Sequence, residues 1–153
     1  MKRTRLPDWR PTTVFSLLLL GASVAPLIAQ SSTDQVWFQL QQQFTTAQKS
    51  GFLQFNYILG WLGGGMAPTV NWPVRLFGGR PFLIVGVCDN ECTDVDLVLE
   101  NQEGIELASD RASDDLPVIR ITPDTTATYW LKPIMHACQV DHCGYGIGVF
   151  VQQ

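Results

Sequence analysis

Ten of the 14 acidic side chains of this 153-residue chain fall between residues 89 and 115, where Arg111 is the only base. Hard cations such as Ca²⁺ take several oxygen ligands from loops and strand ends. Four acids lie close enough in sequence to be candidate calcium ligands: Asp89, Glu91, Asp94 and Asp96. Their spacing is not that of an EF-hand. The alternative is a solvated polar surface whose Asp side chains cap turns.

The four cysteines form two closely spaced pairs: Cys88 with Cys92, and Cys138 with Cys143. In an oxidising compartment such cysteines form disulfides by default. Each local pair brackets a turn of suitable length, which favours Cys88–Cys92 and Cys138–Cys143. Cross-pairing would gain more loop-closure entropy, so it stays open. A zinc site using His136 and His142 is the rival, but the C-x3-C and C-x4-C spacings are atypical of zinc ribbons.

Signals for catalysis are weak. The chain has neither G-x-S-x-G nor H-E-x-x-H, and two histidines leave little for acid–base chemistry near neutral pH. Paired carboxylates of the acidic segment are the residues that a small secreted hydrolase would use, with or without calcium. Trp130 alternates with Tyr129 and Leu131, so an outward indole that stacks on a sugar ring with Trp61 or Trp72 is weighed against ordinary core or edge packing.

Residues 1–29 have the three zones of a secretory signal peptide. Basic residues come first, an apolar run of 15 residues from Val14 to Ile28 follows, and small residues stand after it. A membrane span needs about 20 residues, so an uncleaved anchor is the lesser alternative. We expect cleavage after Ala29 or after Ser31, and a secreted or periplasmic protein without a membrane span.

Cleavage at residue 29 changes the charge of the chain. The formal net charge is −4 for the whole sequence; four bases and one acid leave with the signal peptide, so the remaining residues carry six bases, 13 acids and a net charge of −7. Binding to nucleic acid needs clustered Lys and Arg, and this balance excludes it. The remaining length suits one hydrophobic core.

Residues 30–51 predict one amphipathic helix. Ser32 and Gln35 fit a capping box, and Gly51 ends the pattern. The apolar positions follow a 3-4-3 spacing along one face: Trp37, Leu40, Phe44 and Ala47. Such a face packs against a core or, as the alternative, docks onto a partner protein.

Residues 52–153 predict a β-sandwich domain. Turn signals separate about eight short apolar segments at 55–62, 70–77, 82–88, 94–100, 105–108, 116–122, 126–135 and 145–151. No helices alternate with these segments, which argues against a parallel sheet. We therefore expect a mainly β chain: an antiparallel, jelly-roll-like sandwich with one N-terminal helix.

Two stretches, Asp94-Val95-Asp96-Leu97-Val98-Leu99 followed by Gly104, and Thr128-Tyr129-Trp130-Leu131, resemble the signature of the bacterial pre-peptidase C-terminal domain, a secreted β-sandwich. The resemblance covers residues 70 to 151. Ala127 stands near where that pattern has Gly, and the cysteine pairs resemble a group of uncharacterised exported bacterial proteins instead. The resemblance implies an accessory or binding module without catalytic residues.

These observations predict an exported, non-enzymatic binding module, stabilised by disulfides, whose partner is a protein or a carbohydrate. No cofactor is expected other than the calcium considered above. Two alternatives remain: the small hydrolase, and a partner subunit that docks through the helix at residues 34–50.

Overall fold

The computed structural model describes residues 31–65 and 70–153, so the predicted signal peptide, residues 1–29, lies outside the described residues. The chain forms one helix followed by strands: α1 (Ser32–Lys49), β1 (Phe52–Leu62), β2 (Trp72–Leu76), β3 (Phe82–Cys88), β4 (Cys92–Glu100), β5 (Glu106–Asp110), β6 (Val118–Ile121), β7 (Ala127–Cys138) and β8 (Cys143–Gln152). Each of the segments expected to be strands is a strand, with ends that differ by a few residues. In this part of the chain no helix is long and apolar enough to cross a membrane.

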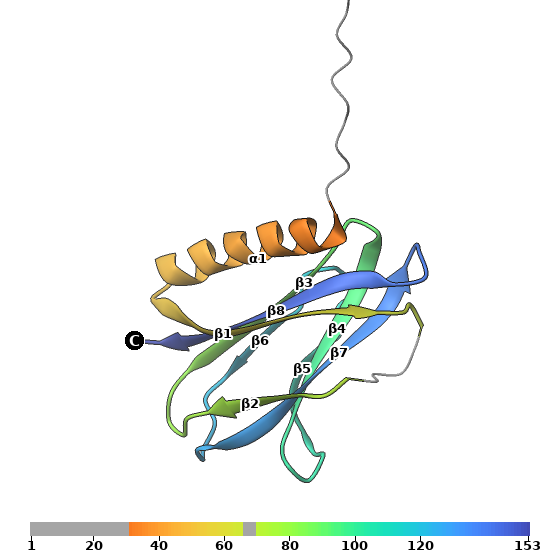
Figure 1. Cartoon of the computed structure of the whole chain (residues 1–153). Coiled ribbons are helices and arrows are strands. Elements are labelled where there is room, and N and C mark those ends of the chain that lie inside the picture. The colour runs from red at the N-terminus through yellow and green to blue at the C-terminus, as the bar shows by residue number, and fades with distance from the viewer. Residues whose placement is uncertain (1–30, 66–69) are drawn as a thin grey trace, which may run out of the picture.

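The strands form two four-stranded antiparallel sheets that face each other (Figure 1). The strand order is β1-β8-β3-β6 in one sheet and β2-β7-β4-β5 in the other. Strands 1, 3, 6 and 8 thus lie in one sheet and strands 2, 4, 5 and 7 in the other, which is the arrangement of a jelly roll. The predicted antiparallel, jelly-roll-like sandwich is confirmed.

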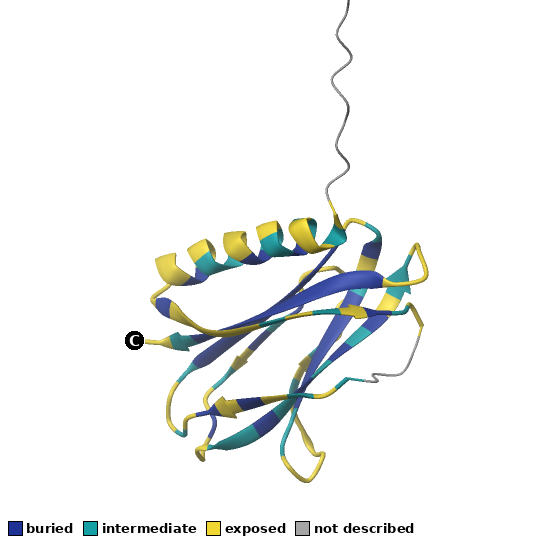
Figure 2. Ribbon diagram, viewed as in Figure 1, coloured by how far each residue is buried: buried dark blue, intermediate teal, exposed yellow. Residues whose placement is uncertain are grey.

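The main core lies between the two sheets. Every residue of β3 is buried, and so are the first eight of β8, so these two strands appear dark blue through the centre of the molecule (Figure 2). One hydrogen bond crosses the core: the indole N–H of Trp72 on β2 donates to the phenolic oxygen of Tyr145 on β8 over 2.7 Å. Burial raises the pKa of Tyr145, and this hydrogen bond opposes the rise.

Helix α1 covers the outer face of the β1-β8-β3-β6 sheet (Figure 1). Its buried side chains are Val36, Leu40 and Ala47. Trp37 and Phe44 are half-buried along the same side, with the Trp37 ring 5.4 Å from the ring of Tyr57 on β1. The helix therefore uses its apolar face for core packing, as the first of the two interpretations expects. Val36 belongs to that face although the 3-4-3 pattern omits it.

The helix begins one residue earlier than the predicted capping box. Ser31, not Ser32, is the N-cap: its hydroxyl oxygen accepts a hydrogen bond from the Asp34 N–H at 3.2 Å and donates to the Asp34 carboxylate at 2.7 Å. Asp34 thus takes the place that Gln35 was expected to fill, because a short acidic side chain in the first turn also interacts favourably with the helix dipole. Signal cleavage after Ala29 keeps this cap, whereas cleavage after Ser31 removes it.

A row of glycines on β8 lets the helix approach the sheet closely. A Cβ atom on Gly146 would lie 2.9 Å from Val36 Cγ1, and one on Gly148 would lie 3.2 Å from Leu40 Cδ1. A Cβ on Gly144 would also meet Val36, at 3.2 Å from Cγ2. The G-x-G-x-G spacing of this segment therefore places three residues without side chains under α1, since alternate strand residues share a face.

Replacing Gly146 by alanine should lower the free energy of unfolding by about 1 to 3 kcal/mol, because the added methyl group overpacks the contact with Val36. The substitution V36A removes the group that the new methyl meets. Urea denaturation of G146A, V36A and the double variant should show that the double variant loses less stability than the two single losses added together. Strict additivity would mean that the glycine is not required by this contact.

Candidate functional site

Two disulfides close neighbouring turns at one end of the sandwich. Cys88 pairs with Cys92 in the β3–β4 turn, and Cys138 pairs with Cys143 in the β7–β8 turn, which are the two local pairs that the sequence favours. Cys92 lies opposite Cys138 in the β4–β7 ladder, so the two disulfides are adjacent. Among the described residues no cysteine is free, so the zinc alternative lacks thiolate ligands.

Asp89, the first predicted calcium ligand, bonds to the start of β8 near the N-terminus of α1. Its side chain is buried, and its Oδ2 accepts the N–H of Gly144 at 2.6 Å. The next residue, Asn90, donates its N–H to the Gln35 side chain at 3.1 Å. The carboxylate borders the same space as Ser32, in the first turn of α1. A negative charge is favourable there because the helix dipole is positive at its N-terminus.

Asp96 lies on the outer face of the other sheet, where its carboxylate meets a histidine and an arginine side chain. Its Oδ2 is 2.9 Å from His136 Nε2 and 3.6 Å from a guanidinium nitrogen of Arg111. The same guanidinium is 2.7 Å from Glu106, which also accepts the hydroxyl of Ser109 at 2.6 Å. These two hydrogen bonds hold the pKa of Glu106 below its usual value. The bond from Ser109 has the larger effect, and that from Arg111 the smaller.

Two other acids of the segment stabilise turns and loops. Asp110 accepts the N–H groups of Ala112 and Val118, and Asp114 accepts that of Leu116. Glu100 forms an ion pair with Lys132 on the neighbouring strand. These bonds match the interpretation of the segment as a polar surface with turn-capping side chains.

The four predicted calcium ligands do not meet at one point. Between residues 31 and 65 and from 70 onwards, no group of three or more His, Cys, Asp or Glu residues is arranged to hold a metal ion. One feature favours a cation: Asp89 Oδ1, Glu91 Oε2 and Asp94 Oδ1 are buried without a hydrogen-bond partner. Calcium binding by Asp89, Glu91, Asp94 and Asp96 therefore stays a prediction.

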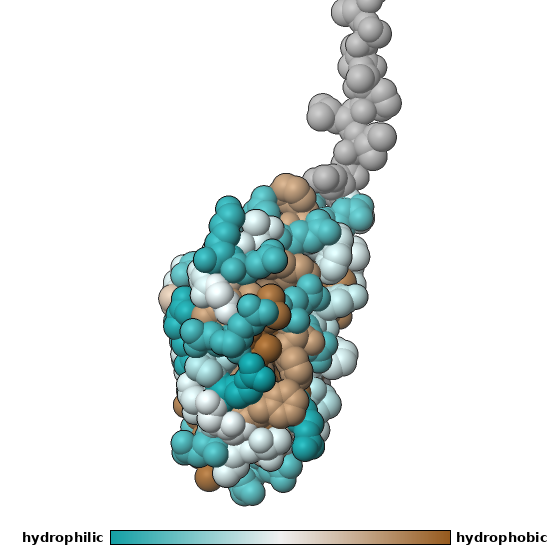
Figure 3. Space-filling model, turned by 90° about the vertical axis from the view of Figure 1, so that its left-hand side faces the viewer, coloured by the Kyte–Doolittle hydropathy of each residue, from teal (hydrophilic) through white to brown (hydrophobic). Residues whose placement is uncertain are grey.

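The outer edge of the helix-covered sheet exposes a row of large apolar side chains. Three of them lie on the side of β1 that faces α1, are each between 36% and 50% exposed, and are called the β1 row: Tyr57, Leu59 and Trp61. Leu53 and Phe55 are also exposed, but Phe55 lies in the bulge and packs against Phe77 and Phe82 on the other side of the strand. Figure 3 shows hydrophobic side chains gathered at the surface on the side where α1 ends and β1 begins. The sequence showed an aromatic-rich strand here, but not that the strand is an edge.

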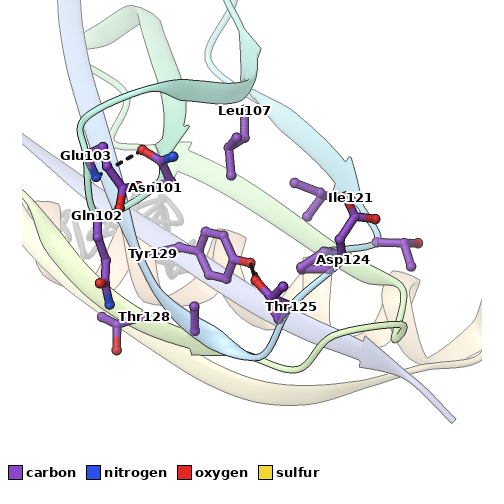
Figure 4. A pocket seen from close by; sticks show the side chains of 12 residues that line it. Asn101, Gln102, Glu103, Leu107, Ile121, Asp124, Thr125, Thr128 and Tyr129 are labelled. Carbon is purple, nitrogen blue, oxygen red and sulfur yellow. Dashed lines mark hydrogen bonds between the residues drawn. The ribbon is translucent and has the colours of Figure 1, made fainter.

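A hollow of about 510 Å³ opens between the β4–β5 turn and the β6–β7 loop (Figure 4). Leu107, Ile121 and Tyr129 supply its apolar surface, and the Tyr129 hydroxyl donates to the Thr125 carbonyl at 2.8 Å. Two carboxylates, Glu103 and Asp124, stand on opposite sides of it, and both are exposed. A glycosidase acid is instead buried against apolar groups so that it stays protonated.

A second hollow of about 320 Å³ lies beside the first, where the β4–β5 turn borders the outer face of the β2-β7-β4-β5 sheet. Trp130 and Lys132 of β7, Glu100 of β4 and Asn71 before β2 line it together with the turn. The alternation of residues 129 to 131 predicted the outward Trp130, whereas its polar neighbours come from three separate segments and no local pattern marks them.

Comparisons with known proteins concern the fold. No protein-family model matches the chain, and no curated protein matches its sequence. Among solved structures, the pre-peptidase C-terminal domain of a collagenase from Bacillus anthracis is similar, with a TM-score of 0.49 and 16% identity over 61% of this chain and 87% of that domain. PliG from Aeromonas hydrophila, a periplasmic inhibitor of g-type lysozyme, is similar with a TM-score of 0.46 and 6% identity over 63% of this chain and 85% of that chain.

The calcium prediction can be tested by thermal stability. A ligand that binds only the folded state must raise the melting temperature. If calcium binds the three carboxyl oxygens that are buried without partners, the melting temperature in millimolar CaCl₂ should exceed that in EDTA, and the D94N variant should lose the difference. Coinciding melts of the wild-type chain in CaCl₂ and in EDTA would contradict calcium binding at Asp89, Glu91, Asp94 and Asp96.

Proposed function

We propose that this chain is an exported, non-enzymatic β-sandwich module that binds another protein through the face formed by α1 and β1. The observation that carries the proposal is the β1 row. Exposed apolar patches of this kind, on a chain that folds with a full core of its own, are typical of protein interaction sites. The disulfides and the predicted signal peptide support export.

The edge strands β1 and β2 differ in how they are protected from pairing with a strand of another molecule. β2 carries Pro73 and Arg75, residue types that discourage pairing with another strand. β1 is longer and contains no proline and no charge. Its first half is blunted by a bulge between Gln54 and Asn56 and by a hydrogen bond from the Tyr57 N–H to the Asn56 side chain. The proposal therefore assigns the partner to the second half of the strand, from Ile58 to Leu62.

Charge separates this face from the rest of the molecule. Between Gln35 and Leu62 the only charged residue is Lys49, whereas ten acids fall in the segment that forms β4, β5 and their turns. Glutamines occupy much of the solvent side of α1, including Gln41, Gln42 and Gln48. Such a surface offers apolar contacts and amide hydrogen bonds, so the partner is recognised without charge complementarity. In this proposal the glutamines of α1 supply the amide hydrogen bonds to the partner.

Within this face, Leu59 and Trp61 are the central contact residues of the proposal. Together with Val36 and Thr33 of α1 they border a small apolar hollow of about 90 Å³. Trp61 is 50% exposed beside it. An exposed tryptophan next to an apolar pocket is the arrangement found at interaction hot spots, where truncation costs most of the binding energy.

The substitution W61D should weaken association at least tenfold, because it puts a charge into the centre of an uncharged contact. The matched control is V140D, since Val140 is also 50% exposed but lies in the β7–β8 turn. Native electrophoresis of extracts from the exporting cells, with sedimentation equilibrium of the purified chain, measures association with other proteins and with a second copy.

The proposal expects wild-type chain and V140D in a complex, and W61D released as monomer. A complex formed by the purified chain alone would identify the partner as a second copy. A wild-type chain that is monomeric in both measurements, or a W61D variant that stays in the complex, would overturn the proposal.

A further inference from the structure

The hollow beside Trp130 has the composition of a sugar-binding site, and it lies on the sheet that faces away from α1. Ladder pairing fixes where its residues stand. Trp130 of β7 lies opposite Glu100 of β4 on one side and Pro73 of β2 on the other. Side chains of directly opposite residues point to the same face of a sheet, so the indole is held between these two neighbours.

Polar side chains that can donate hydrogen bonds and others that can accept them surround the indole. Lys132, two residues along β7, forms an ion pair with Glu100, and their side chains are only 23% and 15% exposed. Asn71 and Gln102 add two amides at the border of the hollow. A partly buried ion pair beside amides can donate to and accept from vicinal hydroxyl groups, which no apolar ligand would use.

One wall of the hollow is rigid before any ligand arrives. The Asn101 side-chain oxygen accepts the N–H groups of Glu103 and Ile105 at 3.1 and 2.8 Å. Gly104, with a φ of 78°, closes the same turn in a conformation that other residues rarely adopt. A fixed wall lowers the entropic cost of binding, because the turn need not be ordered by the ligand.

We propose that this hollow binds a neutral pyranose unit of an oligosaccharide. The apolar C–H face of the sugar packs on the Trp130 indole, and its hydroxyl groups bond to Glu100, Lys132 and the amides of Asn71 and Gln102. An aromatic ring with a few convergent polar groups is the usual composition of a small-ligand site. Glu100, Glu103 and the wider acidic segment repel sulfated or uronic-acid polymers, so the ligand is uncharged.

The site is independent of the protein-binding face proposed above. Trp61 lies on β1 in the helix-covered sheet, whereas Trp130 lies on β7 in the other sheet. The two tryptophans therefore serve as controls for each other: W130A tests the sugar site, and W61A tests whether any exposed indole gives the same signal.

Isothermal titration and tryptophan fluorescence of the chain from residue 30 onwards test the proposal. The probes are hexasaccharides of glucose and of N-acetylglucosamine, with an oligogalacturonate as the anionic control. We expect at least one neutral probe to bind, W130A to weaken it about tenfold or more, K132M to weaken it less, and W61A to bind as the wild type does.

The proposal fails if neither neutral probe binds at millimolar concentration, if the oligogalacturonate binds more tightly, or if W130A binds normally. Circular dichroism and thermal melts establish that each variant is folded. If W130A does not fold, W130F and Q102A replace it: both must weaken the neutral probe, and normal binding by both would overturn the proposal.

Discussion

The close approach of α1 to β8 is the contact on which the rest of the structure depends. β3 and β8 are buried on both faces, so one sheet of the sandwich needs a cover that the other sheet cannot provide. The helix provides it only because Gly144, Gly146 and Gly148 leave room for Val36 and Leu40. The buried carboxylate of Asp89 lies beside this contact, because it accepts the N–H of Gly144 next to the first helical turn. The disulfide of the β3–β4 turn closes the loop that carries this carboxylate.

Seating the helix over β8 also decides which surface is left for a partner. β1 lies at an edge of the sheet that the helix covers. The helix packs on this strand where Trp37 meets Tyr57. Leu59 and Trp61 stay exposed further along the strand. The charges have been kept away from this face and concentrated on β4 and β5, where they bond to turns, to His136 and to Arg111. One face of the sandwich is thus neutral and apolar, and the other is acidic and hydrogen-bonded.

Local patterns predicted much of this fold, and the reasons for the gaps are physical. Alternation and turn residues located the strands, because a two-residue period reports directly on a half-buried sheet. The capping serine was misplaced by one residue, since Ser31 and Ser32 are equally good N-caps and only the Asp34 contact chooses between them. The predicted apolar face omits Val36, because the glycines of β8, and not the helix pattern, decide that this residue of the first turns is buried.

The candidate sites were harder to predict, because they join residues that are distant in sequence. The acids from Asp89 to Asp96 are near one another along the chain, yet Asp89 bonds to Gly144 on β8 and Asp96 to His136 on β7, which belong to opposite sheets. Conversely, Asn71, Gln102 and Trp130 meet only because β2, β4 and β7 are neighbours in one sheet. No spacing rule shows that β1 is an edge strand; strand order does.

The most direct test of the central claim is site-specific photocrosslinking in cells that export the chain. A photoreactive amino acid replaces Trp61 in one variant and Val140 in the other, two positions that are equally exposed. The account predicts a discrete protein adduct from position 61 and none from position 140. Absence of an adduct at position 61, or the same adduct from both positions, would contradict a protein-binding face formed by α1 and β1.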